Sequence, residues 1–279
     1  MRFSGSRGEG VYKGIWSQGQ GRTAELDWTT PQTFQAAIEW LTRNSRRKNF
    51  FLYVDTFDPH EPWDPPRWAT DLYDSNYKGV PYAWAEYGAS SQYGGRELRQ
   101  LRALYAGECT VVDRWFGRLL DTVDLLGLSE DTLVVFMSDH GHYLGYPNDG
   151  RQLGKATGYR KSDGQMAGSD ADVFTPLLDS VSNPIFIARM PGQTRGRVRQ
   201  EMIQPPDLMP TVLDFLKQPV PPTVQGSSML PLLDGRRKAW RTASVSASHR
   251  SFAQISDPRW LYGAWVHAHP PKLFDRRAD

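Results

Sequence analysis

The stretch Thr132-Leu133-Val134-Val135-Phe136-Met137-Ser138-Asp139-His140-Gly141-His142 decides the fold of this 279-residue chain. Its first half is a continuous apolar and β-branched run, which is typical of a strand buried on both faces of a sheet. Its second half changes at once to polar and ionisable residues. Because ligands bind beyond the carboxyl ends of the strands in an α/β sheet, this change indicates a functional site at 138–142.

Similar elements are predicted on both sides of this stretch. Apolar runs predict two more strands, at 49–57 and 184–189. Apolar residues at helical spacing predict three helices, at 31–44, 96–126 and 207–216, with Asp207 at the N-cap of the last. This alternation predicts an α/β fold with a central, largely parallel sheet covered by helices on both faces. Residues 1–30, rich in Gly, Ser and Gln without a period, are predicted to be irregular.

The composition excludes several classes of protein. With 33 basic and 31 acidic residues the net charge is +2, which gives no reason to expect nucleic acid or an anionic membrane as partner. No apolar run reaches the ~20 residues that a membrane-spanning helix needs. Cys109 is the single cysteine, so a disulfide framework is excluded; inside a predicted helix, it is interpreted as a small buried side chain. No secretory signal is visible, which favours the cytoplasm for a complete protein and otherwise leaves the compartment unknown.

Asp139 and His140 are candidate metal ligands. A carboxylate is a hard ligand and an imidazole a borderline one, and both can reach one ion just above the end of a strand. Gly141 allows the backbone to turn sharply there. Two alternatives stay open: Asp139 caps a helix beside an exposed histidine, or His140 and His142 form a zinc pair.

His60 and Lys155 are candidate groups for binding and catalysis. Prolines on both sides of His60 stiffen its loop, and its imidazole can bind an anionic group or protonate a leaving oxygen. The alternative is a loop histidine that packs on Trp63. Lys155 follows a glycine and can reach an anionic substrate as a point charge, although most lysines are simply solvated.

Taken together and in order, these segments resemble the sulfatase family of the alkaline-phosphatase superfamily. Residues 132–145, TLVVFMSDHGHYLG, are close to the family pattern TLVVFTSDHGxxLG. Residues 50–63 resemble the family's strand and histidine loop, and residues 112–120, VDRWFGRLL, resemble its helix VDxxxGxLL. Further segments resemble the family at 183–192, 207–213 and 225–233.

The resemblance implies a fold and a chemistry. It implies an alkaline-phosphatase-like sheet, with the catalytic domain over 31–235 and the start of a small C-terminal subdomain over 236–279. It implies metal-dependent hydrolysis of a small-molecule or glycan sulfate ester. Asp139 and His140 would bind a divalent metal, with calcium favoured and manganese or zinc as alternatives. His60 would contact the sulfate and protonate the leaving oxygen, and Lys155 would bridge the two.

The sequence departs from the family at the nucleophile. In the family this is a formylglycine made from Cys or Ser in a C/S-x-P/A-x-R motif, and neither Cys-x-Pro-x-Arg nor Ser-x-Pro-x-Arg occurs here. The Asp-Asp pair that would supply further metal ligands is also absent. We therefore expect the C-terminal half of a sulfatase-type hydrolase, a fragment with an incomplete sheet. Alternatives are a phosphodiesterase or phosphonate-ester hydrolase of the same superfamily, or a catalytically inactive fragment.

Overall fold

The computed structural model describes residues 21–79, 82–155, 159–160, 166–167, 176–236, 240–248, 252–265 and 270–278. The chain divides into two compact units, and each is described by itself. Unit 1 comprises Met1–Ser129, Tyr143–Gly154 and Arg160–Gln165, and unit 2 comprises Glu130–His142, Lys155–Tyr159 and Met166–Asp279.

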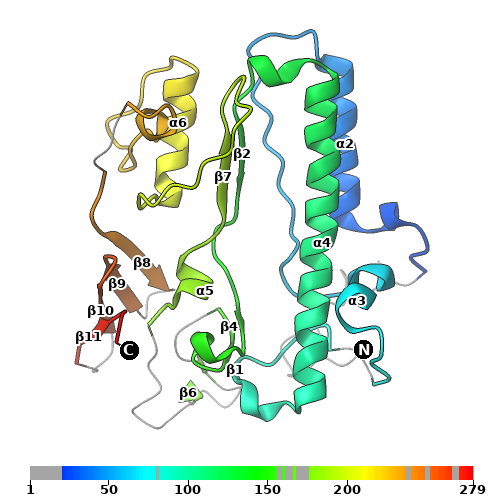
Figure 1. Ribbon diagram of the computed structural model, residues 1–279, viewed down its shortest axis with the longest axis vertical. Coiled ribbons are helices and arrows are strands. Elements are labelled where there is room, and N and C mark those ends of the chain that lie inside the picture. The colour runs from blue at the N-terminus through cyan, green and yellow to red at the C-terminus, as the bar shows by residue number, and fades with distance from the viewer. Residues whose placement is uncertain are drawn as a thin grey trace. The chain divides into compact units, whose positions relative to one another are not determined.

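Three helices form the framework of unit 1 (Figure 1): α2 (Thr29–Asn44), α3 (Arg67–Asp74) and α4 (Gly95–Leu125). α2 and α3 both pack against α4, and the rings of Phe34 and Phe116 meet between α2 and α4 at 6.4 Å. Gly107 lies in the middle of α4, where a Cβ would stand 2.8 Å from Pro65 Cγ. A glycine is therefore needed for the loop before α3 to approach the helix.

A small antiparallel sheet completes unit 1. Its order is β1 (Gly88–Ala89), β4 (Gln152–Gly154), β3 (Tyr143–Leu144). The sheet and α4 share a core of Trp63, Ala85, Leu101, Leu104 and Leu153. Short 3-10 helices lie at Glu25–Asp27 (η1), Ser90–Gln92 (η2), Leu128–Glu130 (η3) and Pro147–Asp149 (η4).

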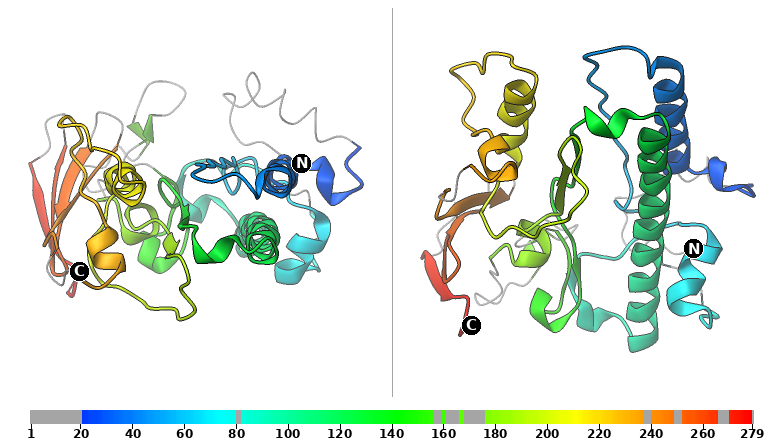
Figure 2. Two further views of the ribbon diagram at one scale, coloured as in Figure 1. Left: turned by 90° about the horizontal axis from the view of Figure 1, so that it is seen from above. Right: turned by 45° about the horizontal axis from the view of Figure 1, so that its top comes forward.

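Unit 2 contains a two-stranded ribbon, short helices and a four-stranded sheet. β2 (Val134–Met137) pairs with β7 (Phe186–Arg189). The helices are α5 (Asp179–Ser182), η5 (Pro205–Asp207), α6 (Leu208–Phe215) and α7 (Leu230–Leu233). The sheet joins β8 (Ser244–Ser248), β9 (Phe252–Ser256), β10 (Trp260–Trp265) and β11 (Lys272–Asp275) in sequence order, all antiparallel (Figure 2). Two short strands, β5 (Tyr159–Arg160) and β6 (Met166–Ala167), are also described.

Most of the predicted elements are confirmed. The predicted helices correspond to α2, α4 and α6, and the strands at 132–138 and 184–189 correspond to β2 and β7. The mixture of helices and sheets is that of an α/β protein. α3 was not predicted, because only eight residues carry its pattern. Over the described residues, no helix combines the length and the apolar character that crossing a membrane would require.

The prediction of a largely parallel sheet is not borne out, since the ladders described are antiparallel. In the β2–β7 ribbon, Val134 faces Arg189 and Met137 faces Phe186. A parallel pair needs a crossover connection, usually through a substantial helix. The helices described between β2 and β7 are only the three-residue η4 and the four-residue α5, and alternation of strands and helices in the sequence does not fix strand direction.

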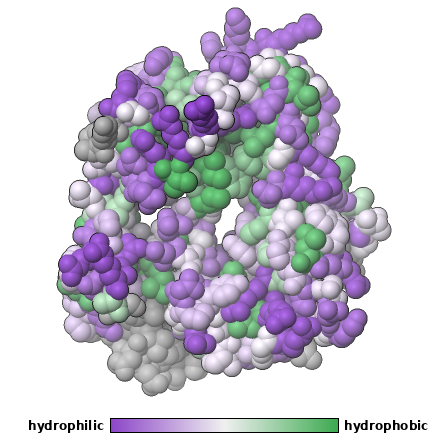
Figure 3. All heavy atoms as spheres, viewed as in Figure 1, coloured by the Kyte–Doolittle hydropathy of each residue, from purple (hydrophilic) through white to green (hydrophobic). Residues whose placement is uncertain are grey.

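The prediction of a buried strand at 49–57 is wrong. This segment is extended but is not paired as a strand. Exposure alternates along it, and the exposed positions carry Phe51 and Tyr53, whose accessible fractions are 63% and 71%. The β2–β7 ribbon also exposes apolar side chains, including Ile185 and Ile187, and hydrophobic surface is visible over it in Figure 3. Both segments have the composition of buried strands without the burial.

Candidate functional site

The loop that carries His60 is held from both ends in unit 1. The His60 amide donates to the Phe57 carbonyl at 3.0 Å. The buried Trp63 indole donates to the Pro59 carbonyl at 3.1 Å, and the Trp63 amide donates to Ala83 at 2.6 Å. Pro59 and Pro62 each fix a backbone φ angle of the loop. The position of the imidazole is therefore fixed by the loop.

The His60 ring has a carboxylate partner that the sequence did not suggest. Its Nδ1 lies 2.6 Å from the Glu61 carbonyl oxygen and 3.2 Å from Glu61 Oε2. Glu61 is fully buried, and the Tyr87 hydroxyl donates to its Oε1. Because the Glu61 carbonyl oxygen can only accept, the proton of the neutral ring is placed on Nδ1. Proton exchange with a substrate would then use Nε2, and 29% of the side chain is exposed.

Three carboxyl groups and one arginine lie behind this loop. Arg22 Nη1 donates to Asp64 Oδ2 at 2.7 Å, and the Asp64 amide donates to Glu108 Oε1 of α4 at 2.8 Å. Burial raises the pKa of Asp64 to about 6 although Arg22 acts to lower it. Burial, followed by the Asp58 and Asp64 carboxyls, raises the pKa of Glu108 well above its ordinary value. Burial also raises the pKa of Asp58.

The two predicted metal ligands lie together at the end of β2, in unit 2. Asp139 Oδ1 accepts from the His140 amide at 2.8 Å, and Asp139 Oδ2 is 3.6 Å from His140 Nε2. The Asp139 side chain is 86% exposed. Ser138 donates to the His140 carbonyl at 2.7 Å, which closes the turn. Asp139 does not cap a helix here, so that alternative is not observed.

Gly141 permits this turn to pack against α5. Its amide donates to the Val181 carbonyl at 2.9 Å, and a Cβ would lie only 1.9 Å from the Ser180 carbonyl oxygen. Any other residue would push the strand end away from α5. The glycine that the sequence marked as a turn therefore positions both neighbouring ligands.

Asp139 and His140 supply two donors to a metal. Zinc takes four ligands and calcium six to eight, so the pair is an incomplete coordination set. Among the residues described, no group of three His, Cys, Asp or Glu side chains is placed to hold an ion. His142 is buried. Because no such group of three is described, the structure also gives no support to a zinc pair from His140 and His142.

Lys155 and Cys109 complete the predicted residues. Lys155 directly follows β4 and belongs to unit 2, whereas His60 belongs to unit 1. A Cβ on Gly154, just before Lys155, would lie 2.6 Å from Tyr87 Cγ. Burial raises the pKa of Cys109 to about 11, which is the environment of an inert structural thiol.

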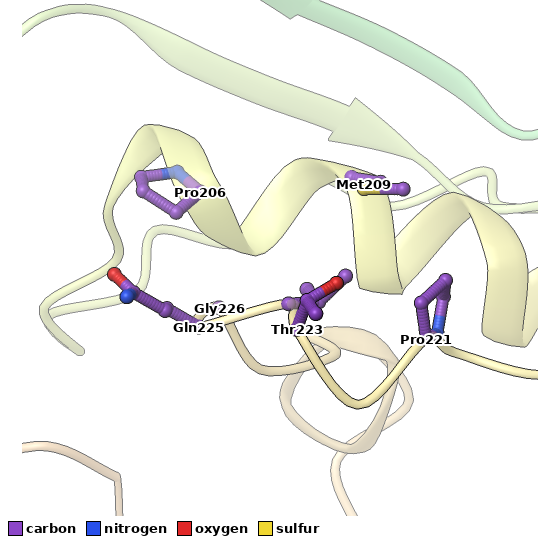
Figure 4. Close-up of a pocket in the computed structure, with 7 residues that line it drawn as sticks. Pro206, Met209, Pro221, Thr223, Gln225 and Gly226 are labelled. Carbon is purple, nitrogen blue, oxygen red and sulfur yellow. The ribbon is translucent and has the colours of Figure 1, made fainter.

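A hollow of about 460 Å³ lies in unit 2 between α6 and the loop that precedes α7 (Figure 4). Its lining includes Pro206, Met209, Pro221, Thr223, Gln225 and Gly226. None of these side chains ionises in the physiological range, so we assign no chemistry to it. A Cβ on Gly226 would lie 1.9 Å from the Pro206 carbonyl oxygen, which shows how closely the loop approaches η5.

The chain is similar in sequence to a protein family and to individual known proteins. A family model described as "Sulfatase" matches residues 18–218. An arylsulfatase of Clostridium perfringens is 29% identical over 222 residues, covering 74% of this chain and 42% of the relative. PehA of Trinickia caryophylli, described as a multifunctional alkaline phosphatase superfamily protein, is 32% identical over 66% of this chain and 35% of its own length.

Among solved structures, a phosphonate monoester hydrolase from Silicibacter pomeroyi superposes with a TM-score of 0.68 at 25% identity. The superposition covers 92% of this chain and 55% of that protein. The chain thus spans about half, or less, of the length of these relatives.

Proposed function

Because the chain belongs to the sulfatase family, we propose that it forms part of a metal-dependent sulfuric ester hydrolase acting on a small-molecule or glycan sulfate ester. The observation that carries the proposal is that the matched segment, residues 18–218, contains His60, Asp139, His140 and Lys155 together. We take residues 31–235 as the catalytic portion of the chain.

His60 and Lys155 have complementary roles in this proposal. His60 contacts the sulfate and delivers a proton from Nε2 to the leaving oxygen, since Nδ1 faces Glu61. Glu61 is a positioning residue, because its carboxylate orients the ring and stabilises the imidazolium that protonation forms. The Lys155 ammonium neutralises charge on the sulfate and the leaving oxygen.

Asp139 and His140 would hold a divalent cation, calcium first and manganese or zinc as alternatives. When bound, such a cation supplies Lewis-acid stabilisation of the negative charge on the sulfate oxygens. The two donors of this pair need further ligands from outside the described residues. We likewise place the nucleophile outside the sequence given, which makes this chain about half of the active hydrolase.

A second candidate is hydrolysis of phosphate diesters or phosphonate monoesters by the same residues. The likeness to the Silicibacter pomeroyi phosphonate monoester hydrolase favours it, and a cation bound by carboxylate and imidazole suits either anion. A third candidate is an inactive sulfatase-like fragment, which the missing nucleophile motif favours for this chain alone.

Calorimetric titration of the 279-residue chain with calcium and manganese tests the first step. We expect the chain to bind the cation and Asp139→Ala to abolish this binding. The control Asp131→Ala should leave it unchanged, since Asp131 is an exposed aspartate before β2, at the end away from Asp139. Binding that survives Asp139→Ala would remove Asp139 from the metal site. Complementation with the missing half, assayed on aryl sulfates and aryl phosphonates, then separates the first candidate from the second. Complete inactivity of the complemented protein supports the third.

A further inference from the structure

A cationic cleft on the side of α4 is not used by the proposed catalytic groups. It has a volume of about 480 Å³ and lies entirely within unit 1. Arg99 and Arg102 line it, Tyr73 and Tyr146 form exposed aromatic walls, and Ala103 and Ala106 provide a shallow floor. Clefts of this volume are common as sites for small ligands.

Arg102 is held rigidly at the cleft. Its Nε donates to the Leu144 carbonyl at 2.9 Å and its Nη2 to the Gly145 carbonyl at 2.8 Å. Its guanidinium carbon lies 3.9 Å from the centre of the Tyr146 ring. These contacts fix the side chain without neutralising its charge, because carbonyl groups carry no net charge.

The loop that holds Arg102 is itself strongly determined. Gly145 has a φ of +75°, and a Cβ there would lie 2.7 Å from Ser90 Cβ. The buried Asp149 accepts from the Leu144 amide at 2.9 Å and from the Tyr146 amide at 3.3 Å. The two carbonyls and the Tyr146 ring therefore form a preorganised wall.

The two arginines of the cleft form no ion pair in the described part of the chain. Neither Arg99 nor Arg102 is paired there with a carboxylate, whereas Arg96, one turn earlier, is 3.5 Å from Asp74. The Arg99 side chain makes no hydrogen bond or ion pair with any described residue. Two like charges near two aromatic faces favour a ligand that combines negative groups with a ring.

We propose that this cleft binds an anionic sugar unit of a sulfated oligosaccharide, through sulfate contacts to Arg99 and Arg102 and packing of the sugar ring against Tyr73 and Tyr146. The choice of a sulfated saccharide over other ring-bearing anions rests on the proposed function. The cleft would add affinity for long chains without taking part in hydrolysis.

Calorimetric titration of the full chain with D-glucosamine 2-N,6-O-disulfate tests the proposal. Arg99→Gln should weaken binding about tenfold, since one charge-assisted contact is lost. Arg118→Gln is the matched control: it is an exposed arginine on the same helix, stacked on Trp115 but outside the cleft, and it should leave affinity unchanged. Tyr146→Ala should also weaken binding. N-acetylglucosamine and inorganic sulfate should each bind more weakly than the disulfate.

Several outcomes would overturn the proposal: no binding, equal losses in Arg99→Gln and Arg118→Gln, or inorganic sulfate that binds as tightly as the sugar. The same titration on the His60→Ala/Lys155→Ala chain separates the cleft from the catalytic groups. Binding retained there and lost in Arg99→Gln supports the cleft even if no sulfate ester is hydrolysed. Binding lost with the catalytic pair assigns the ligand to that pair instead.

Discussion

Asp64 in unit 1, which is partly buried, and Asp207 in unit 2, which is fully buried, both bind an arginine, yet their pKa values shift in opposite directions. Asp207 accepts hydrogen bonds from two guanidinium nitrogens of Arg241, at 2.5 and 2.7 Å. It also accepts hydrogen bonds from the amides of Gln204 and Ser227. Burial alone would raise the pKa of Asp207, but these four donors hold it below its ordinary value. Burial raises the pKa of Asp64 to about 6 despite Arg22.

The difference lies in the number of donors and of like charges. Arg22 gives Asp64 one ion-pair contact, and the nearby Asp58 carboxyl acts to raise its pKa. Arg241 binds Asp207 with two parallel hydrogen bonds, and the amides of Gln204 and Ser227 add two further donors. An arginine partner is therefore insufficient to define the protonation state of an aspartate.

The largest expected effect follows from removing the better-matched arginine. Arg241→Ala should lower the free energy of unfolding by about 3–5 kcal/mol, because it leaves a fully buried carboxylate uncompensated. The pKa of Asp207 is lowered only with Arg241 in place, and burial acts to raise it once the guanidinium is gone. The loss should therefore be largest at pH 8 and shrink toward low pH, where the carboxyl is protonated. Urea unfolding followed by tryptophan fluorescence measures it. A loss below 1 kcal/mol would show that the two amides alone satisfy Asp207.

Arg22→Ala should behave differently. At pH 5 Asp64 is largely protonated in the folded chain, so the loss should be about 1 kcal/mol, as for an ordinary hydrogen bond. Toward pH 8 Asp64 ionises and the penalty should grow. The same urea titrations at several pH values provide the measurement. A penalty that does not vary with pH would mean that Asp64 is already ionised at pH 5.

The sequence predicted the positions of the helices and strands better than it predicted which distant residues they contact. The periodicity of α4 and the apolar run of β2 identified both elements, because these signals lie within one segment. Asp207 was correctly placed at the N-cap of α6, but its carboxylate makes no capping bond to α6 and binds Arg241, a contact across 34 positions. The direction of the strands and the exposure of residues 49–57 likewise depend on contacts with segments that are distant in the sequence.

The candidate site shows the same limit. Asp139 and His140 were recognisable because they are adjacent to each other and to a glycine at a strand end. Glu61 was missed although it follows His60 directly, since nothing in the local pattern distinguishes a buried glutamate from a solvated one. Glu108 lies 44 positions from its Asp64 partner. Only the packing of α4 against the His60 loop reveals either carboxyl group.

At pH 5 the smallest effect should come from Glu108→Gln, and the sign of its change with pH sharpens the contrast between the two aspartates. The folded pKa of Glu108 is raised, so its folded form retains a proton that the unfolded chain releases as pH rises above about 4.5, and stability falls. Glutamine cannot ionise, and its side-chain oxygen can still accept from the Asp64 amide. We therefore expect a change below about 0.5 kcal/mol at pH 5 and a gain in stability by pH 8.

Asp207→Asn, an equally conservative change, should instead destabilise at pH 8 and less so near pH 3. If Glu108→Gln grew more destabilising with rising pH, Glu108 would be ionised in the folded protein and the buried carboxyls behind His60 would have to be paired with a cation.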